Sequence, residues 1–271
     1  MSCYLFEHLD VLGQRIAQAP ALVVFLHMNG SFASSPEMTR QGELSPSVRQ
    51  TLRALARLED VEVAIFSSRK LSGLKESFGL PDLCYAGNDG LEICTPECTF
   101  VEPAALALQG ALRDLAGELA RKLQPVAGVA IEDNGLAIAV RCHEVAEGDL
   151  EAVRRGVHAA LSSSSHPFVL TQGDKVYEIR PRVYWSKADA ARWIKEQTGR
   201  QDALAIYVGD SASDEDAFAA LADGVTLRVG SAPDSAARYH VNEPHEVHEF
   251  LGWLANFQVD RLLAEPRPAC V

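Results

Sequence analysis

The sequence lacks a long hydrophobic run. Its clearest apolar stretch, Ala21 to Leu26, is far shorter than the ~20 residues that a membrane-spanning helix needs. Glu7 and Asp10 stand where an export signal would carry basic charge, so we expect a cytoplasmic protein with no membrane partner. Positive charge is also scarce, because 25 lysines and arginines face 37 aspartates and glutamates, which gives a net charge of −12. Such a chain repels polyanions, and this argues against a nucleic-acid partner.

Cysteine is sparse and unpatterned. With no export signal, the six cysteines of this 271-residue chain are interpreted as reduced thiols. Only Cys94 and Cys98 lie near each other, and their spacing matches neither a redox motif nor a complete zinc site. Hydrophobic residues make up 47% and charged residues 23%, so the composition predicts a folded protein of one or two domains.

Hydrophobic periodicity predicts strands that alternate with helices at both ends of the chain, which is typical of a parallel α/β sheet. We expect strands over 21–26, 61–66, 83–86, 204–208 and 225–229, and helices over 5–17, 45–58, 187–197, 214–221 and 244–254.

The middle of the chain has a different pattern. It predicts helices over 104–123 and 150–161 and strands over 129–132, 136–141, 168–171 and 175–179. Asn134-Gly135 between two of these strands is a strong hairpin signal. We therefore expect a core domain of residues 1–93 and 180–271, interrupted by an inserted α/β domain of residues 94–179.

Polar side chains follow three of the expected parallel strands, at His27 to Ser31, Ser67 to Arg69 and Gly209 to Asp214. Ligands of open parallel sheets bind at such strand ends, and Lys187 opens the helix that follows the insertion. Hydroxyl groups, a glycine turn, one lysine and two carboxylates are suited to hold a phosphate with a divalent cation.

Three stretches resemble one family, the trehalose-6-phosphate phosphatase branch of the haloacid-dehalogenase superfamily. They are Gly79 to Ile93, Val176 to Arg182, and Gly209 to Phe218. The resemblance implies a Rossmann-like core with a parallel sheet, an inserted α/β cap, a Mg²⁺ cofactor and a sugar phosphate such as trehalose-6-phosphate.

One departure from the family concerns its chemistry. In the family, the first strand ends in Asp-x-Asp, whose first carboxylate attacks phosphorus and whose second transfers the proton. Here the same place holds His27 and Asn29. Neither an imidazole nor an amide supplies a hard anionic oxygen, and Asn29 has no proton to exchange near neutral pH. The resemblance therefore implies impaired phosphoryl transfer.

The resemblance also assigns roles to other residues, and these roles stand as expectations. Catalysis would involve Lys187 and the degenerate positions His27 and Asn29. Phosphate would be bound by Gly30, Ser31, Ser67, Arg69 and Lys187, and the sugar by Glu132, Lys175, Glu178 and Arg180. A metal ion, if its binding is not lost, would be held weakly by Asp210 and Asp214. Further departures from the family are Ser211 at a usually acidic position, Asp89 at a usual histidine and Asn134 at a usual lysine.

Plainer interpretations of these residues stay open. Asp214 is also placed to cap the following helix, and Asp210 to pair with Lys187. His27 is also an alternative phospho-accepting nucleophile. Replacing two aspartates removes about two negative charges, which favours phosphate binding without metal.

Three functions follow from this pattern. The first is a pseudophosphatase of trehalose metabolism, which binds a sugar phosphate or regulates a trehalose-pathway enzyme. The second is an active Mg²⁺-dependent phosphomonoester hydrolase with an atypical site. The third is a structural or dimerisation subunit.

Overall fold

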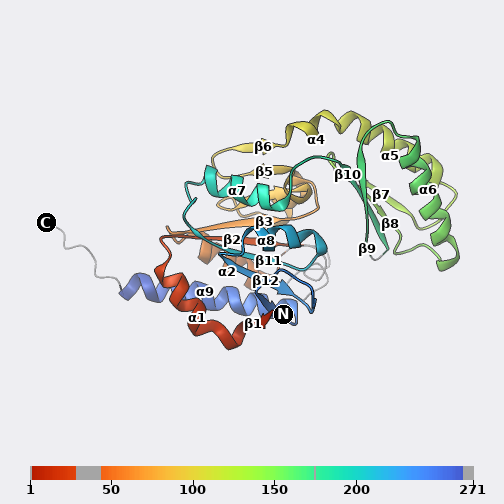
Figure 1. Ribbon diagram of the computed structural model, residues 1–271. Coiled ribbons are helices and arrows are strands. Elements are labelled where there is room, and N and C mark those ends of the chain that lie inside the picture. The colour runs from red at the N-terminus through yellow and green to blue at the C-terminus, as the bar shows by residue number, and fades with distance from the viewer. Residues whose placement is uncertain (1, 29–43, 174, 265–271) are drawn as a thin grey trace. The chain divides into compact units, whose positions relative to one another are not determined.

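The computed structural model describes residues 2–28, 44–173 and 175–264 (Figure 1). The chain forms two compact units, Met1–Thr99 with Ser186–Val271, and Phe100–Trp185. Both boundaries of the second unit lie six residues after those expected from the sequence, 100 against 94 and 186 against 180. No helix within the described ranges is long and apolar enough to cross a membrane.

The first unit is built on a nine-stranded sheet in the order β1-β13-β12-β11-β2-β3-β4-β5-β6. Adjacent strands from β1 to β4 along this order are parallel, and β5 is antiparallel to β4. The strands are β1 (Cys3–Tyr4), β2 (Leu22–His27), β3 (Val61–Phe66), β4 (Cys84–Gly87), β5 (Glu92–Cys94), β6 (Thr99–Val101), β11 (Leu204–Gly209), β12 (Val225–Val229) and β13 (Tyr239–Val241).

Helices cover both faces of this sheet (Figure 1). They are α1 (Leu9–Gln18), α2 (Pro46–Ala56), α3 (Leu71–Phe78), α7 (Lys187–Gln197), α8 (Glu215–Ala220) and α9 (Pro244–Ala264), with 3-10 turns η1 (Leu5–His8), η2 (Asn88–Gly90) and η4 (Ala212–Asp214). Two helices begin as the sequence signals predict. Pro46 follows the N-cap Ser45 of α2, and Ser186 forms a capping box with Asp189 at the start of α7.

The alternation of side chains along β2 decides which face His27 joins. Leu22, Val24 and Leu26 pack with residues of α1, α2 and α9 in one buried cluster. Because successive strand residues point to opposite faces, Phe25 and His27 belong to the other face. The ring of Phe25 contacts the ring of Tyr207 there, which in turn packs edge-on against Phe218 of α8.

The second unit is a four-stranded antiparallel sheet in the order β7-β8-β10-β9. Its elements are β6 in part, α4 (Pro103–Ala107), α5 (Gln109–Leu123), β7 (Ala130–Asp133), β8 (Ile138–Arg141), η3 (Glu147–Asp149), α6 (Leu150–Ser163), β9 (Phe168–Gly173) and β10 (Val176–Pro181). Leucines of α5 and valines of α6 pack on one face of this sheet and form the core of the unit. The Asn134-Gly135 turn joins β7 to β8, as its sequence predicts.

Several elements differ from the sequence prediction. The helix expected over 104–123 is divided at Leu108, whose ψ of 0° departs from α geometry. The short strands β1, β5, β6 and β13 were not predicted, because runs of two or three residues carry no readable alternation. The last helix continues to Ala264, ten residues beyond the expected end at Leu254.

Candidate functional site

The ends of the central parallel strands bring the predicted crevice residues together. His27 is the last residue of β2, which lies between β11 and β3. From β2 the chain continues to β3 on one side and returns in β11 on the other, so the strand order reverses here, as at the ligand sites of open α/β sheets. The side chain of His27 is buried, with 2% of the residue exposed.

Asp214 is the centre of the site and is fully buried. Oδ1 accepts hydrogen bonds from Lys187 Nζ (2.8 Å) and Tyr207 OH (3.0 Å); Oδ2 accepts them from His27 Nδ1 (2.9 Å), Asp210 N (3.1 Å), Ser211 N (2.9 Å) and Ser211 Oγ (2.7 Å). Burial alone would raise the pKa of Asp214, but the charges of His27 and Lys187 hold it well below its usual range. Asp214 is therefore a buried carboxylate ion that organises the groups around it.

Gly209 makes this arrangement possible. A Cβ at this position would lie 2.5 Å from Cγ of Asp214 and 2.6 Å from its Oδ2. Since real Cβ atoms do not approach other atoms so closely, any side chain at position 209 would displace the carboxylate. Position 209, where β11 ends beside Asp214, therefore requires glycine.

Lys187 is the second buried charge of the site, with 3% of the residue exposed. The capping box of α7 fixes it as the first residue of that helix. Its Nζ lies 2.8 Å from Asp214 Oδ1 and 3.3 Å from Asp89 Oδ1, and donates a 2.8 Å hydrogen bond to Ser213 Oγ. Burial lowers the pKa of Lys187, but the two carboxylates outweigh it and the pKa rises. Lys187 is therefore a permanent cation.

The position of Asp89 is set by two loops that are joined by backbone hydrogen bonds. The backbone N–H of Asp89 donates to the carbonyl of Ser67 (2.9 Å), and that of Asn88 donates to the carbonyl of Arg69 (2.8 Å). Asn88 and Asp89 adopt left-handed conformations, with φ of 48° and 57°. Such a backbone conformation costs about 1 kcal/mol per residue, and Asn and Asp tolerate it better than other side chains. The strain turns a carboxylate toward Lys187.

His27 lies among three carboxylates. Its Nδ1 is 2.9 Å from Asp214 and 3.5 Å from Asp210, and its Nε2 is 3.7 Å from Asp89. Burial and the charge of Lys187, whose Nζ is 3.3 Å from Nε2, lower the pKa of His27. The carboxylates Asp214 and Asp210 outweigh both, and the pKa rises to about 9. At neutral pH the cluster therefore contains two cations, His27 and Lys187, and three carboxylates.

The fit of this cluster to Mg²⁺ is poor. Ligand atoms of His27, Asp210 and Asp214 lie within 4.8 Å of one another, close enough to surround one cation. Mg²⁺ requires oxygen ligands in octahedral geometry, but a protonated imidazole donates hydrogen bonds and cannot ligate. A carboxylate has about four lone-pair positions, and Asp214 already accepts six hydrogen bonds. These residues therefore do not fit a magnesium ion, and the ring of His27 itself places positive charge between the carboxylates.

The expected phosphate-binding residues are only partly described. Ser67 is fully buried, and its Oγ accepts a 3.2 Å hydrogen bond from the backbone N–H of Arg69, so it shapes the loop after β3. Asn29, Gly30 and Ser31 lie outside the described residues. The phosphate-binding role of these positions thus stays a prediction.

The expected sugar-binding residues belong to the second unit. Glu132, Ala139 and Glu178 form one row across β7, β8 and β10, on the face opposite the helices, and Arg180 points to the same face. Glu132 is exposed and accepts a 2.7 Å hydrogen bond from Arg141, whereas Lys175 occupies the turn before β10 with φ of 51°. Three of the four predicted residues therefore share one polar sheet face.

Sequence reasoning missed several members of the cluster. The sequence marks Asp89 only as a departure from the family, and it indicates no role for Tyr207 or Ser213. Tyr207 alternates with apolar strand residues, so nothing in the sequence distinguishes it from an ordinary core aromatic. The plainer interpretation of Asp214 as the cap of the following helix is wrong, because its side chain makes no capping bond to α8. Asp214 is the N3 residue of a capping box at the preceding 3-10 turn, whose N-cap is Ser211. The ion pairs found for Lys187 are with Asp89 and Asp214.

The known proteins that are similar in sequence to this chain include trehalose phosphatases. The sequence profile of the family Trehalose-phosphatase matches residues 25–245. Trehalose 6-phosphate phosphatase RA3 of Zea mays is 31% identical over 260 residues, which cover 89% of this chain and 71% of that protein. The chain spans 62% of the length of the trehalose-phosphate phosphatase of Mycobacterium tuberculosis, to which it is also 31% identical.

Solved structures share the fold. The C-terminal domain of Candida albicans trehalose-6-phosphate phosphatase has a TM-score of 0.76 at 17% identity, covering 94% of this chain and 98% of that domain. The C-terminal domain of the Candida albicans trehalose synthase regulatory protein has a TM-score of 0.70 at 13% identity, covering 89% and 97%. With a family profile that extends over most of its length and a relative above 30% identity, this chain belongs to the trehalose-phosphatase family.

Proposed function

We propose that this chain is a pseudophosphatase that keeps the trehalose-phosphatase fold but does not transfer phosphoryl groups. It acts by binding a sugar phosphate or by binding a trehalose-pathway enzyme. The observation that carries the proposal is His27. It ends the central strand where the family resemblance expects an attacking carboxylate, and its imidazolium is held by Asp214, Asp210 and Asp89. A protonated ring has no lone pair with which to attack phosphorus.

The electrostatics of the cluster support the same proposal. Its positive charges come from His27 and Lys187, and both are already paired with carboxylates. Activation of the leaving oxygen requires an acid placed for that task, and Asn29 at the expected acid position carries an amide. Loss of the general acid alone lowers a rate by roughly 10²–10⁴.

The regulatory form of the proposal has one further support. A solved relative in fold, the Candida albicans trehalose synthase regulatory protein, is a regulator by its name. We infer that a chain of this fold whose crevice no longer performs chemistry serves a similar role toward a trehalose-pathway enzyme.

The test is phosphate release from trehalose-6-phosphate with Mg²⁺, measured for the unmodified chain and for the double variant His27→Asp, Asn29→Asp. The proposal expects no turnover from the unmodified chain and Mg²⁺-dependent turnover from the double variant. The matched control, Glu132→Asp with Asn134→Asp, changes residues of the second unit and should produce no such gain. Turnover by the unmodified chain that is lost in His27→Ala refutes the proposal.

Calorimetry separates the two binding roles. Trehalose-6-phosphate is titrated into the chain in excess chelator, which tests binding without metal. Heat at millimolar ligand, abolished in Lys187→Met, supports a sugar-phosphate sensor. No heat, with the double variant still active, supports regulation of a partner instead.

One observation favours a second candidate, an active hydrolase with an atypical site. The carboxylate of Asp89 lies 3.3 Å from Lys187 and 3.7 Å from His27. In this alternative an oxygen of Asp89 attacks phosphorus, the bond from phosphorus to the sugar oxygen breaks, and His27 Nε2 gives its proton to that oxygen. Water then hydrolyses the acyl phosphate to regenerate Asp89 and release phosphate. Trapping of an aspartyl phosphate at residue 89, absent in Asp89→Asn, would establish this candidate and overturn the first.

A further inference from the structure

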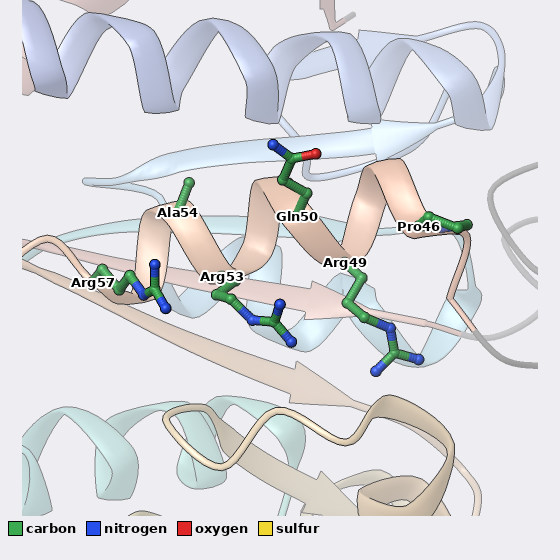
Figure 2. A pocket seen from close by; sticks show the side chains of 6 residues that line it. All are labelled: Pro46, Arg49, Gln50, Arg53, Ala54 and Arg57. Carbon is green, nitrogen blue, oxygen red and sulfur yellow. The ribbon is translucent and has the colours of Figure 1, made fainter.

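A separate feature lies on the outer surface of α2, away from the site. Arg49, Arg53 and Arg57 follow one another at intervals of four residues and line one groove of about 550 Å³ along the helix. Figure 2 shows the three side chains extending from the same side of α2, whereas Gln50 and Ala54 point elsewhere. We call this surface the arginine face.

The arginine face is unusual for its charge. Residues 45–57 contain three arginines and no acidic residue, a local charge of +3 in a chain of net −12, so the rest of the chain carries −15. Arg53 and Arg57 are exposed, and within the described ranges their guanidinium groups make no hydrogen bond or ion pair. Arg49 differs, because its guanidinium donates to the carbonyls of Phe78 and Ser77 at the end of α3.

We propose that the arginine face binds an acidic helical segment of a protein partner. Its charges repeat every four residues, ~6 Å along the helix, and span ~12 Å in all. A single phosphate is too small to reach all three. Carboxylates at every fourth residue of a second helix have the same repeat, so each can face one guanidinium in turn. The strong negative charge of the rest of the chain repels a long polyanion such as a nucleic acid, which favours a short acidic segment.

The anchored arginine sets the register of this contact. Arg49 is half-buried and held by two backbone carbonyls, so its position is fixed before a partner arrives. Arg53 and Arg57 remain adaptable and can close on carboxylates. The alkyl parts of the three arginine side chains supply the apolar lining of the groove.

The experiment uses the full chain and two synthetic peptides of equal composition. One carries glutamates at positions i, i+4 and i+8 of an alanine-rich helix, and the other carries them on three different sides. Fluorescence anisotropy should show tighter binding of the first peptide, with an affinity that falls as salt is raised, because the charges are exposed. Arg53→Ala with Arg57→Ala should weaken binding by about tenfold.

The matched control removes two exposed arginines from another helix, Arg113→Ala with Arg121→Ala on α5, and should leave binding unchanged. Alanine is the best helix former, so both double variants should keep their circular dichroism spectra. Equal affinity for the two peptides, or binding unaffected by the α2 variant, overturns the proposal. So does arginine-dependent dimerisation in light scattering, or binding of inorganic polyphosphate but not of the peptide. None of these results bears on the phosphatase assays, so the two proposals fail separately.

Discussion

The charge of His27 should make the stability of this protein depend on pH in a defined window. The pKa of His27 is raised from an ordinary value of 6.5 to about 9 by the carboxylates Asp214 and Asp210, against burial and the charge of Lys187. Because the folded state binds this proton more tightly than the unfolded state, the stabilisation is fully present below pH 6.5 and is lost as the pH rises through about 9. At ~1.36 kcal/mol per pH unit, the loss is roughly 3 kcal/mol.

Urea unfolding at intervals between pH 6 and pH 9.5 measures this effect, with His27→Gln as the perturbation. Glutamine cannot become protonated, so the variant should be less stable than the parent at pH 6 by about 3 kcal/mol, and the difference should shrink toward pH 9.5. The comparison cancels groups that titrate in both proteins. His248→Gln, which removes a half-buried imidazole beside Thr51, serves as the matched control. A constant difference between parent and His27→Gln across this pH range would refute the reasoning.

Three further predictions concern the surroundings of the site. Gly209→Ala should lower the free energy of unfolding by about 2–4 kcal/mol, because its Cβ would overlap the carboxylate of Asp214, whereas Gly252→Ala, whose Cβ meets nothing within 4 Å, should be neutral or slightly stabilising in the same urea titrations. Equal effects would contradict this account. Tyr207→Phe should cost about 1.5–3 kcal/mol, since it removes a buried hydrogen bond to a charged group, and an unchanged unfolding midpoint would count against that bond. Burial raises the pKa of the Cys84 thiol, so peptide mapping should find it unlabelled by iodoacetamide in the native protein and labelled in urea, and rapid native labelling would be inconsistent with the fold.

The sequence predicts the parallel strands and their polar ends well, because buried strands read as continuous apolar runs. Val61–Phe66, Lys187–Gln197 and Val225–Val229 have the bounds that periodicity indicates. Chemistry at the ends of these strands was also foreseeable, since parallel strands must deliver their C-terminal residues to one edge. The antiparallel middle segment was recognisable from its alternating apolar runs together with the Asn134-Gly135 turn.

The inner arrangement of the site could not be predicted in this way. The pairing of Lys187 with Asp89 depends on the left-handed turn at Asn88 and Asp89, which carries no periodic signal. A second limit is the resemblance itself. It assigns each residue the role that the family provides, so it marks His27 as a lost nucleophile and does not indicate a cation among three carboxylates.

The hydrogen bonds of Asp214 bear on how this protein could have changed during evolution. Four of its six donors, Tyr207 OH, Asp210 N, Ser211 N and Ser211 Oγ, come from a five-residue stretch at the end of β11. Most of the hydrogen bonds to the Asp214 carboxylate are therefore local to this turn, and His27 of β2 adds one more together with its charge. A mutation at residue 27 removes one contact and leaves this local network standing, so ancestors could sample different side chains there while remaining folded. Because the turn keeps most of its own hydrogen bonds, the trehalose-phosphatase fold can persist after selection for catalysis is relaxed. The same fold can then acquire a new function.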